Sequence, residues 1–199
     1  DAYTDANNHG FLEKNRNITT NKTTLSGLYQ AEGQDVNVYH VVTFTDYTFD
    51  TEGKVTENFL SNEGIISAMG NHNKAILDGL FITGGLADGV KAENQRGGAA
   101  VLPDYAHVRN CIVHTNEASE EGGALYMKPS SLVSGTLLVN NRSGNRGGAI
   151  YVEEPLQAQA EDVPAEQGDA KEYARVFTSP IVKNSALQGG GINFQTNLR

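Results

Sequence analysis

The sequence predicts an all-β fold, a parallel β-helix in which each coil takes about 25 residues. The first observation is a glycine phrase, Gly-Gly followed by small and apolar residues, that recurs along the second half of the chain. Its copies begin at Gly97, Gly122, Gly147 and Gly189, with spacings of 25, 25 and 42 residues. The second is an apolar run that ends in asparagine between the glycine copies. These runs are Ile112–Asn116, Leu137–Asn141 and Ile181–Asn184.

The period favours short strands over helices. Helical repeats run to ~34–47 residues and contain long segments of 3.6-residue periodicity, and a propeller blade takes ~40–45 residues. Here no segment exceeds about eight residues before a Gly or Asn interrupts it. One coil of a parallel β-helix fits the period, and neighbouring coils are then expected to stack at ~4.8 Å, the spacing of strands in a sheet.

The first 85 residues combine short predicted strands with polar stretches. Val36–Phe44 is a predicted strand because β-branched and aromatic residues dominate it. Leu80–Gly85 is the next, after a turn at Asp78-Gly79. Gln30–Asp35 and Thr45–Asn58 are predicted polar loops.

From residue 80 onward the repeat sets the order of the elements. One strand position recurs in every coil, at Leu80–Ile82, Cys111–Val113, Thr136–Leu138 and Ser179–Ile181. Residues 153–173 interrupt the last coil as an acidic, Ala- and Gln-rich loop insertion that we expect to be solvated. Residues 1–199 are expected to form a single β-helix domain. The chain does not begin with Met and shows no terminal capping unit, which suggests a fragment of a longer chain.

Alternation along the glycine-linked strands assigns their two faces. One alternating set is wholly apolar and is expected inside: Ala100/Leu102, Leu125/Met127, Ile150/Val152 and Ile192/Phe194. The other set is expected outside: Ala99/Val101, Ala124/Tyr126, Ala149/Tyr151 and Gly191/Asn193. The paired glycines are expected at sharp corners with positive φ and no room for a Cβ. The recurring asparagines are expected in left-handed conformation, each bonded to the equivalent residue one coil away.

Composition narrows the classes of function. The 199 residues carry a formal net charge of −9 and no basic run, which argues against nucleic acid as a partner. No window is long and apolar enough for a membrane span. The single cysteine, Cys111, lies in an apolar run and is expected to be a buried, inert thiol.

Several phrases resemble a known group of proteins. Thr23–Gly27, Val38–Val42, Ala75–Gly85 and Asn184–Ile192 are similar to the right-handed parallel β-helix repeats of bacterial surface proteins. The resemblance points to secreted choice-of-anchor proteins of Bacteroidetes and to the repeats of polymorphic outer-membrane autotransporters. It covers roughly residues 10–199, apart from the polar excursions and the acidic insertion. It implies a pectate-lyase-like superhelix, an extracellular or cell-surface location and a C-terminal sorting region, and it transfers no catalytic residues.

The main alternative is a polysaccharide lyase or glycoside hydrolase of the β-helix type. A glycosidase needs two carboxylates ~5–9.5 Å apart across a cleft. The acidic candidates are Asp78, Asp88 and Asp104, with His107 and Arg109 nearby. None pairs with another at the coil period, and Asp78 and Asp104 adjoin turn residues, so we assign no catalytic residue.

Metal or cofactor binding is not predicted. Glu120-Glu121 and Glu153-Glu154 offer hard oxygen ligands suited to Ca²⁺, but solvated turn charges explain them better. The histidines show no ligand spacing, and they are His9, His40, His72, His107 and His114. His114 alternates with Val113 and is expected at the surface.

Tyr126 and Tyr151 stand one coil apart on the same predicted outward face. They either cover the sheet as a stacked aromatic pair or form a platform for a sugar ring or a partner chain. The leading hypothesis is a non-enzymatic secreted or cell-surface protein acting as adhesin, binding scaffold or component of an outer-membrane assembly. A cell-surface glycan or an outer-membrane protein complex is the expected partner.

Overall fold

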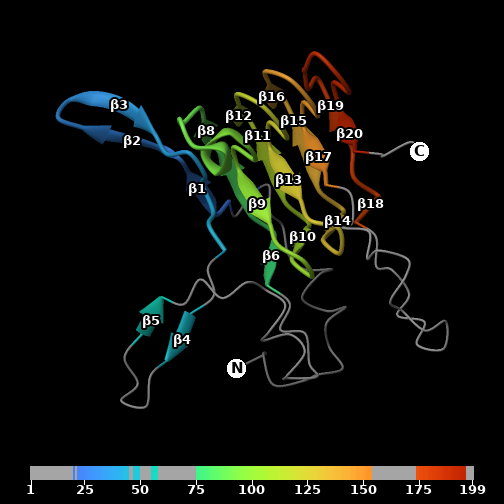
Figure 1. Ribbon diagram of the computed structural model, residues 1–199, viewed down its shortest axis with the longest axis horizontal. Helices are drawn as coiled ribbons and strands as arrows, with labels where there is room; N and C mark the ends of the chain where they lie inside the picture. Colours follow the sequence, from blue (N-terminus) through green and yellow to red (C-terminus); the bar gives the residue numbers. More distant parts are fainter. Residues whose placement is uncertain are drawn as a thin grey trace, which may run out of the picture.

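The chain folds into a parallel β-helix of stacked coils (Figure 1). This computed structural model describes residues 20, 22–44, 47–49, 55–57, 75–153 and 174–195. The first coil contains β6 (Ile76–Asp78), β7 (Phe81–Thr83), β8 (Leu86–Ala87), the 3₁₀ helix η1 (Ala92–Gln95) and β9 (Ala100–Leu102). The second contains β10 (His107–Arg109), β11 (Ile112–His114), β12 (Glu117–Ala118) and β13 (Leu125–Met127). The third contains β14 (Leu132–Ser134), β15 (Leu137–Val139), β16 (Arg142–Ser143) and β17 (Ile150–Val152). The fourth contains β18 (Arg175–Phe177), β19 (Ile181–Val182) and β20 (Ile192–Phe194).

Equivalent strands of successive coils pair in parallel, so each coil contributes one strand to a sheet. The sheets run in the orders β6-β10-β14-β18, β7-β11-β15-β19, β8-β12-β16 and β9-β13-β17-β20. In the last of these, Leu125 pairs with Ala100 on one side and with Ile150 on the other. The 25-residue register is the one that the glycine copies predict, and the predicted β-helix is confirmed.

The N-terminal region adds one strand and an antiparallel hairpin. β1 (Thr24–Ser26) extends the second sheet by pairing with β7. The chain then forms β2 (Leu28–Ala31) and β3 (Gln34–Asn37), a ribbon that projects from the solenoid (Figure 1). Glu32 and Gly33 have φ of 52° and 79°, as a tight type I′ hairpin turn requires.

Three sequence predictions for this region are wrong in part. Gln30–Asp35 is the tip of the hairpin rather than an irregular loop, because its backbone groups pair across the ribbon. Thr45–Asn58 contains a second hairpin, β4 (Tyr47–Phe49) with β5 (Val55–Glu57). The predicted strand Val36–Phe44 divides in two, since β3 ends at Asn37 and the following residues run along the first coil, where Val42 bridges Ala100.

The core is a column of small and aliphatic side chains inside the coils. Ala100, Leu125 and Ile150 lie in it, fully buried at equivalent positions, as the alternation predicts. Burying one such Leu or Ile side chain stabilises the fold by about 2 kcal/mol. At the fourth coil the column opens, because Ile192 is half-buried and Phe194 is exposed. The outward assignment of Ala99, Ala124 and Ala149 is wrong, because these corner residues are buried in the same core.

The glycine pairs form one corner of each coil, as predicted. The first glycine of each pair is left-handed, with φ of 61° at Gly97, 63° at Gly122 and 65° at Gly147. The second glycine lies against backbone of the neighbouring coil, and a Cβ on Gly148 would overlap the carbonyl oxygen of Gly190. Only glycine fits both positions.

A buried asparagine ladder forms a second corner. Asn116, Asn141 and Asn184 stack coil on coil. Asn141 and Asn184 each accept two hydrogen bonds from the asparagine before them, and Asn116 accepts one from the Gly85 backbone N–H. The predicted left-handed conformation of these asparagines is wrong. It belongs to the preceding residue, with φ of 55° at Thr115 and 56° at both Asn140 and Lys183.

A third corner carries a ladder that the sequence analysis missed. The Thr136 hydroxyl accepts from the Cys111 backbone N–H (3.3 Å), and the Ser179 hydroxyl accepts from the Thr136 N–H (3.2 Å). Cys111 is buried at the start of this ladder, and its thiol donates to the Arg109 carbonyl (3.1 Å). Burial raises the pKa of the Cys111 thiol, in agreement with the predicted inert cysteine.

Some predictions concern residues outside the described ranges. These are residues 154–173 of the acidic insertion, His9 and His72. Among the described residues, no helix combines the length and apolar character that crossing a membrane requires.

Candidate ligand platform at Tyr126 and Tyr151

Tyr126 and Tyr151 lie at the centres of β13 and β17 and pair in register. Their ring centroids are 5.2 Å apart and their planes meet at 23°, a stacked arrangement. The separation is close to the distance between neighbouring strands. The stack therefore follows directly from the 25-residue period.

Cationic side chains cover this stack. The guanidinium of Arg96 lies 5.1 Å from the Tyr126 centroid, and that of Arg146 lies 5.1 Å from the Tyr151 centroid. The ammonium of Lys128 is 5.9 Å from the Tyr126 centroid. Cations at such distances are attracted to the negative face of an aromatic ring. With this cover, Tyr126 is only 4% exposed and Tyr151 only 1%.

Glu121 holds the two arginines in place. Its carboxylate forms an ion pair with Arg96, 3.0 Å from Nε, and accepts a hydrogen bond from a terminal nitrogen of Arg146. The Glu121 side chain is only 5% exposed. The backbones of the three residues bridge in parallel, one per coil. Arg96, Glu121 and Arg146 thus form an ion ladder, a positive, a negative and a positive side chain stacked beside the tyrosines.

Two polar contacts complete the surroundings of the stack. The Tyr151 hydroxyl donates to Gln195 Oε1 at 2.7 Å. Lys128 Nζ and Glu153 Oε2 form an ion pair at 2.5 Å. Burial is the main cause that raises the pKa of Tyr126 and of Tyr151, with the charge of Glu153 next for Tyr126 and that of Glu121 next for Tyr151. Both phenols are therefore neutral at physiological pH.

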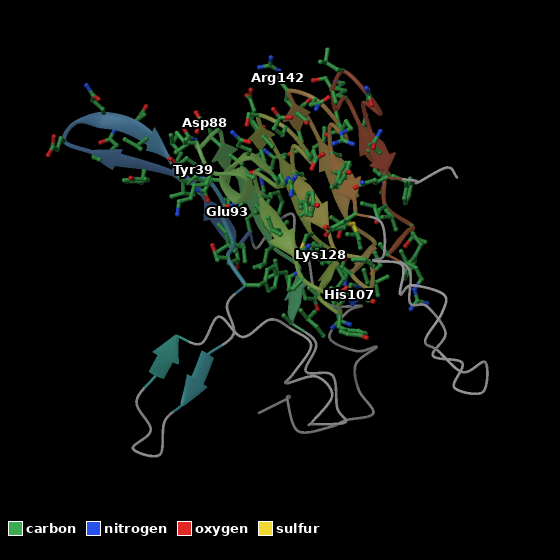
Figure 2. All side chains as sticks on the ribbon, viewed as in Figure 1. Tyr39, Asp88, Glu93, His107, Lys128 and Arg142 are labelled. Atoms are coloured by element: carbon green, nitrogen blue, oxygen red, sulfur yellow. The ribbon has the colours of Figure 1, made fainter. Side chains whose placement is uncertain are left out.

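In this geometry the aromatic rings are not available to a ligand, whereas the cationic side chains are. The ring faces are occupied by each other and by guanidinium groups, so a sugar ring has no open aromatic face to stack on. The accessible groups are instead the cations. The side chains of Arg96, Arg146 and Lys128 are 39%, 34% and 39% exposed to solvent. Figure 2 shows Lys128 on the lower part of the solenoid, far from Arg142 at its top.

The acidic residues considered for catalysis hold separate structural contacts. Asp78 pairs with Arg109 (3.1 Å) and accepts from Asn110 Nδ2 (3.1 Å), which ties two coils together. Asp104 accepts from the backbone N–H of Ser130 (3.0 Å). Asp88 and His107 belong to neighbouring coils, and Figure 2 shows them on different sides of these coils, Asp88 at the upper left and His107 at the lower right. Of the five candidates, the structure pairs Asp78 with Arg109, whereas Asp88 lies on another side of the coils.

The residues considered for metal binding are also dispersed. Within the described ranges, no three His, Cys, Asp or Glu side chains gather closely enough to hold a metal ion. Glu120 accepts from Asn145 Nδ2 (3.1 Å), and Glu121 and Glu153 bind the cations named above. His40 donates to the Gly97 carbonyl (2.9 Å), and His107 lies 2.8 Å from the Ser134 hydroxyl. His114 is half-buried opposite Val113, and burial lowers its pKa.

The arginines that cover the tyrosines were not predicted from the sequence. Arg96, Glu121 and Arg146 each precede a glycine pair, so the 25-residue period places them in one column. Charge alternates along that column, and in a parallel β-helix such alternation predicts a ladder of ion pairs between coils. This pattern in the sequence could have identified the arginines.

One comparison with known proteins identifies a repeat in this chain. Residues 135–153 match the Chlamydia polymorphic membrane protein repeat. This segment spans β15, β16 and β17 and includes Asn141, the Gly147-Gly148 corner and Tyr151. No curated protein and no solved structure shows a significant match to the chain. The chain is a parallel β-helix repeat protein whose third coil is similar to the repeat of the Chlamydia polymorphic membrane proteins.

Proposed function

We propose that this chain is the β-helical portion of a secreted or cell-surface protein, and that it serves as an adhesin or binding scaffold. The observation that carries the proposal is the use of polar side chains inside the solenoid. Asparagines and hydroxyls stack at two corners inside the coils, one position per coil, and each bonds to its equivalent in the next coil. An ion ladder joins the coils in the same way on the outer side of the sheet. Such residues build a rigid rod and leave recognition to its outer surface.

Two features favour a surface role. The repeat in the third coil is named for membrane proteins of Chlamydia, which is consistent with display at a bacterial surface. The hairpin β2–β3 projects from the rod (Figure 1). It carries Leu28 and Tyr29, which are 50% and 49% exposed. A cell-surface glycan or an outer-membrane protein complex is the proposed partner, and the covered Tyr126–Tyr151 stack is the proposed contact surface.

A glycan array probed with the labelled 199-residue chain tests this proposal. We expect saturable binding to a subset of glycans without cleavage of any of them. Binding should fall in a chain carrying Tyr126→Leu and Tyr151→Leu, provided that its circular dichroism remains that of a folded β protein. Turnover of a glycan that is lost on Asp78→Asn or Asp104→Asn, and kept on Asp88→Asn, would overturn the proposal in favour of an enzyme.

A further inference from the structure

The tyrosine stack and its covering cations form a surface whose charge is opposite to that of the chain as a whole. Three cationic side chains, Arg96, Arg146 and Lys128, surround the two rings. Two carboxylates, Glu121 and Glu153, accompany them, so the cluster has a formal charge of +1, from three positive and two negative groups. The full chain has a formal charge of −9.

The positive groups of this cluster are more exposed to solvent than its negative groups, which makes its surface more positive than the formal charge indicates. The Glu121 side chain is 5% exposed, whereas those of its two arginine partners are 39% and 34% exposed. The negative member of the ion ladder therefore lies beneath the surface and the positive members face solvent. At the ion ladder a dissolved ligand therefore meets guanidinium groups before it meets Glu121. The Glu153 side chain beside Lys128 is 28% exposed, less than the three cationic side chains.

The arginines are also held in position. Each contacts a tyrosine face and forms an ion pair with Glu121. The nitrogen closest to the carboxylate is Nε in Arg96 and a terminal nitrogen in Arg146. A guanidinium has five N–H donors in a planar fork that matches a carboxylate or sulfate. Most N–H donors of both arginines therefore remain free to bind a ligand. Because the two side chains are already held in place in the folded protein, binding costs less conformational entropy.

From these observations we infer that the Tyr126–Tyr151 surface binds the acidic group of a saccharide, a carboxylate or sulfate, through Arg96, Arg146 and Lys128. Nucleic acid is disfavoured because the dense charge of its phosphates would be repelled by the chain's net negative charge. A neutral glycan is disfavoured because the aromatic faces are covered. The inference rests on the proposed binding function and specifies the class of ligand.

The test compares two forms of one oligosaccharide, a hexasaccharide of alternating glucuronate and N-acetylglucosamine, as the free acid and as its methyl ester. Titration calorimetry with the full 199-residue chain should show binding of the acid and at least tenfold weaker binding of the ester. Affinity for the acid should also fall as salt rises. Equal binding of the two forms overturns the inference but leaves a glycan-binding function intact. Binding to neither form, with binding to neutral glycans on the array, overturns it as well. Equal binding of polyglutamate overturns the assignment to a saccharide.

Variants localise the site. Arg146→Gln and Lys128→Gln should each weaken binding of the acid several-fold, whereas Arg146→Lys should retain part of it because the charge remains. The matched control is Arg142→Gln. Arg142 also pairs with a glutamate one coil away, at 2.9 Å from Glu117, but it lies away from the tyrosines. A loss of affinity in Arg142→Gln equal to that in Arg146→Gln would show general attraction by any cation and would overturn the site. Thermal unfolding of each variant verifies that it is folded.

Discussion

The Oδ1 atom of Asn141 accepts two hydrogen bonds from Asn116, one from its backbone N–H at 3.0 Å and one from its side-chain amide at 3.1 Å. Asn184 repeats this relationship with Asn141 at 2.8 and 3.0 Å. Asn116 and Asn141 are each 1% exposed, so water cannot replace a lost partner. Each asparagine therefore serves as the hydrogen-bond acceptor for the coil before it, which explains why the residue type recurs with the coil.

Replacement of Asn141 by Leu should destabilise the fold strongly. The variant leaves the buried Asn116 backbone N–H without its acceptor and removes the side-chain amide that donates to the Val113 carbonyl. A buried polar group without a partner costs about 1–3 kcal/mol, so we expect a loss of about 3 kcal/mol in the free energy of unfolding. Urea denaturation followed by circular dichroism measures it. Asn145→Ala is the control, because Asn145 bonds to Glu120 at the surface, and its effect should be within about 0.5 kcal/mol.

The glycine corner predicts a contrast between two equivalent glycines. Gly148→Ala should unfold the protein or cost more than about 3 kcal/mol, because its Cβ would overlap backbone of the fourth coil. Gly190→Ala in the next coil should cost less than about 1 kcal/mol, since its Cβ would meet only the Asn184 carbonyl oxygen at 3.5 Å. Thermal melts of the two variants test this. Equal destabilisation would show that backbone flexibility, rather than contact between coils, sets the requirement for glycine.

The coil period could be predicted from the sequence because two corners of each coil require particular residue types. A glycine at Gly123 or Gly148 and an asparagine at Asn116 or Asn141 have steric and hydrogen-bonding reasons that no common substitute meets. The parallel sheets and the interior column at Ala100, Leu125 and Ile150 follow from them. The hydroxyl corner was harder to predict, because Cys111, Thr136 and Ser179 share a hydrogen-bonding role but not a residue type.

Two parts of the structure were not predicted from the sequence, a hairpin outside the repeat and the cover of the tyrosine stack within it. The hairpin β2–β3 mixes polar with apolar residues and has no regular alternation, and its register is set by the tight turn at Glu32-Gly33. At the tyrosine stack, alternation placed Tyr126 and Tyr151 outside the core but gave no measure of their exposure. Their cover comes from residues five or more positions away, Arg96 and Arg146, whose reach depends on side-chain conformation.

The ladders predict unequal hydrogen exchange in the third and fourth coils. The backbone N–H groups of Asn141 and Gly147 donate to Asn184 Oδ1 and to the Gln188 carbonyl. The corresponding N–H groups of Asn184 and Gly189 have no acceptor among the residues that the structure describes. NMR should therefore show slow exchange at Asn141 and Gly147 and fast exchange at Asn184 and Gly189. Comparable protection at all four would mean that another segment lies against the fourth coil.

The buried phenols predict a loss of stability in alkali. Burial raises the pKa of Tyr126 and Tyr151 in the folded state above the ordinary value of 10.0, and the unfolded chain ionises near that value. Their contribution is fully present below pH 10 and is lost as pH rises above it, because the unfolded state then binds fewer protons. The expected slope is at most about 1.4 kcal/mol per pH unit for each tyrosine.

Urea unfolding between pH 9 and pH 11.5 measures this slope, and absorbance of tyrosinate reports ionisation. A chain with Tyr126→Phe and Tyr151→Phe keeps the stacked rings and should lose stability less steeply. Tyr29→Phe is the matched control, because that ring is half exposed on the hairpin, and it should leave the slope unchanged. An identical slope in the double variant would assign the alkaline transition to other groups.

Glu121→Gln should move stability and ligand binding in opposite directions. The variant keeps the shape of the side chain but removes the charge that joins Arg96 to Arg146, and we expect a loss of about 1–2 kcal/mol in the free energy of unfolding. The same change raises the formal charge of the tyrosine surface from +1 to +2, so the acidic hexasaccharide should bind several-fold more tightly. Chemical denaturation and calorimetry on one preparation separate the two effects. Weaker binding in this variant would show that Glu121 contributes mainly by orienting the arginines, and unchanged binding would place the anion site elsewhere on the rod.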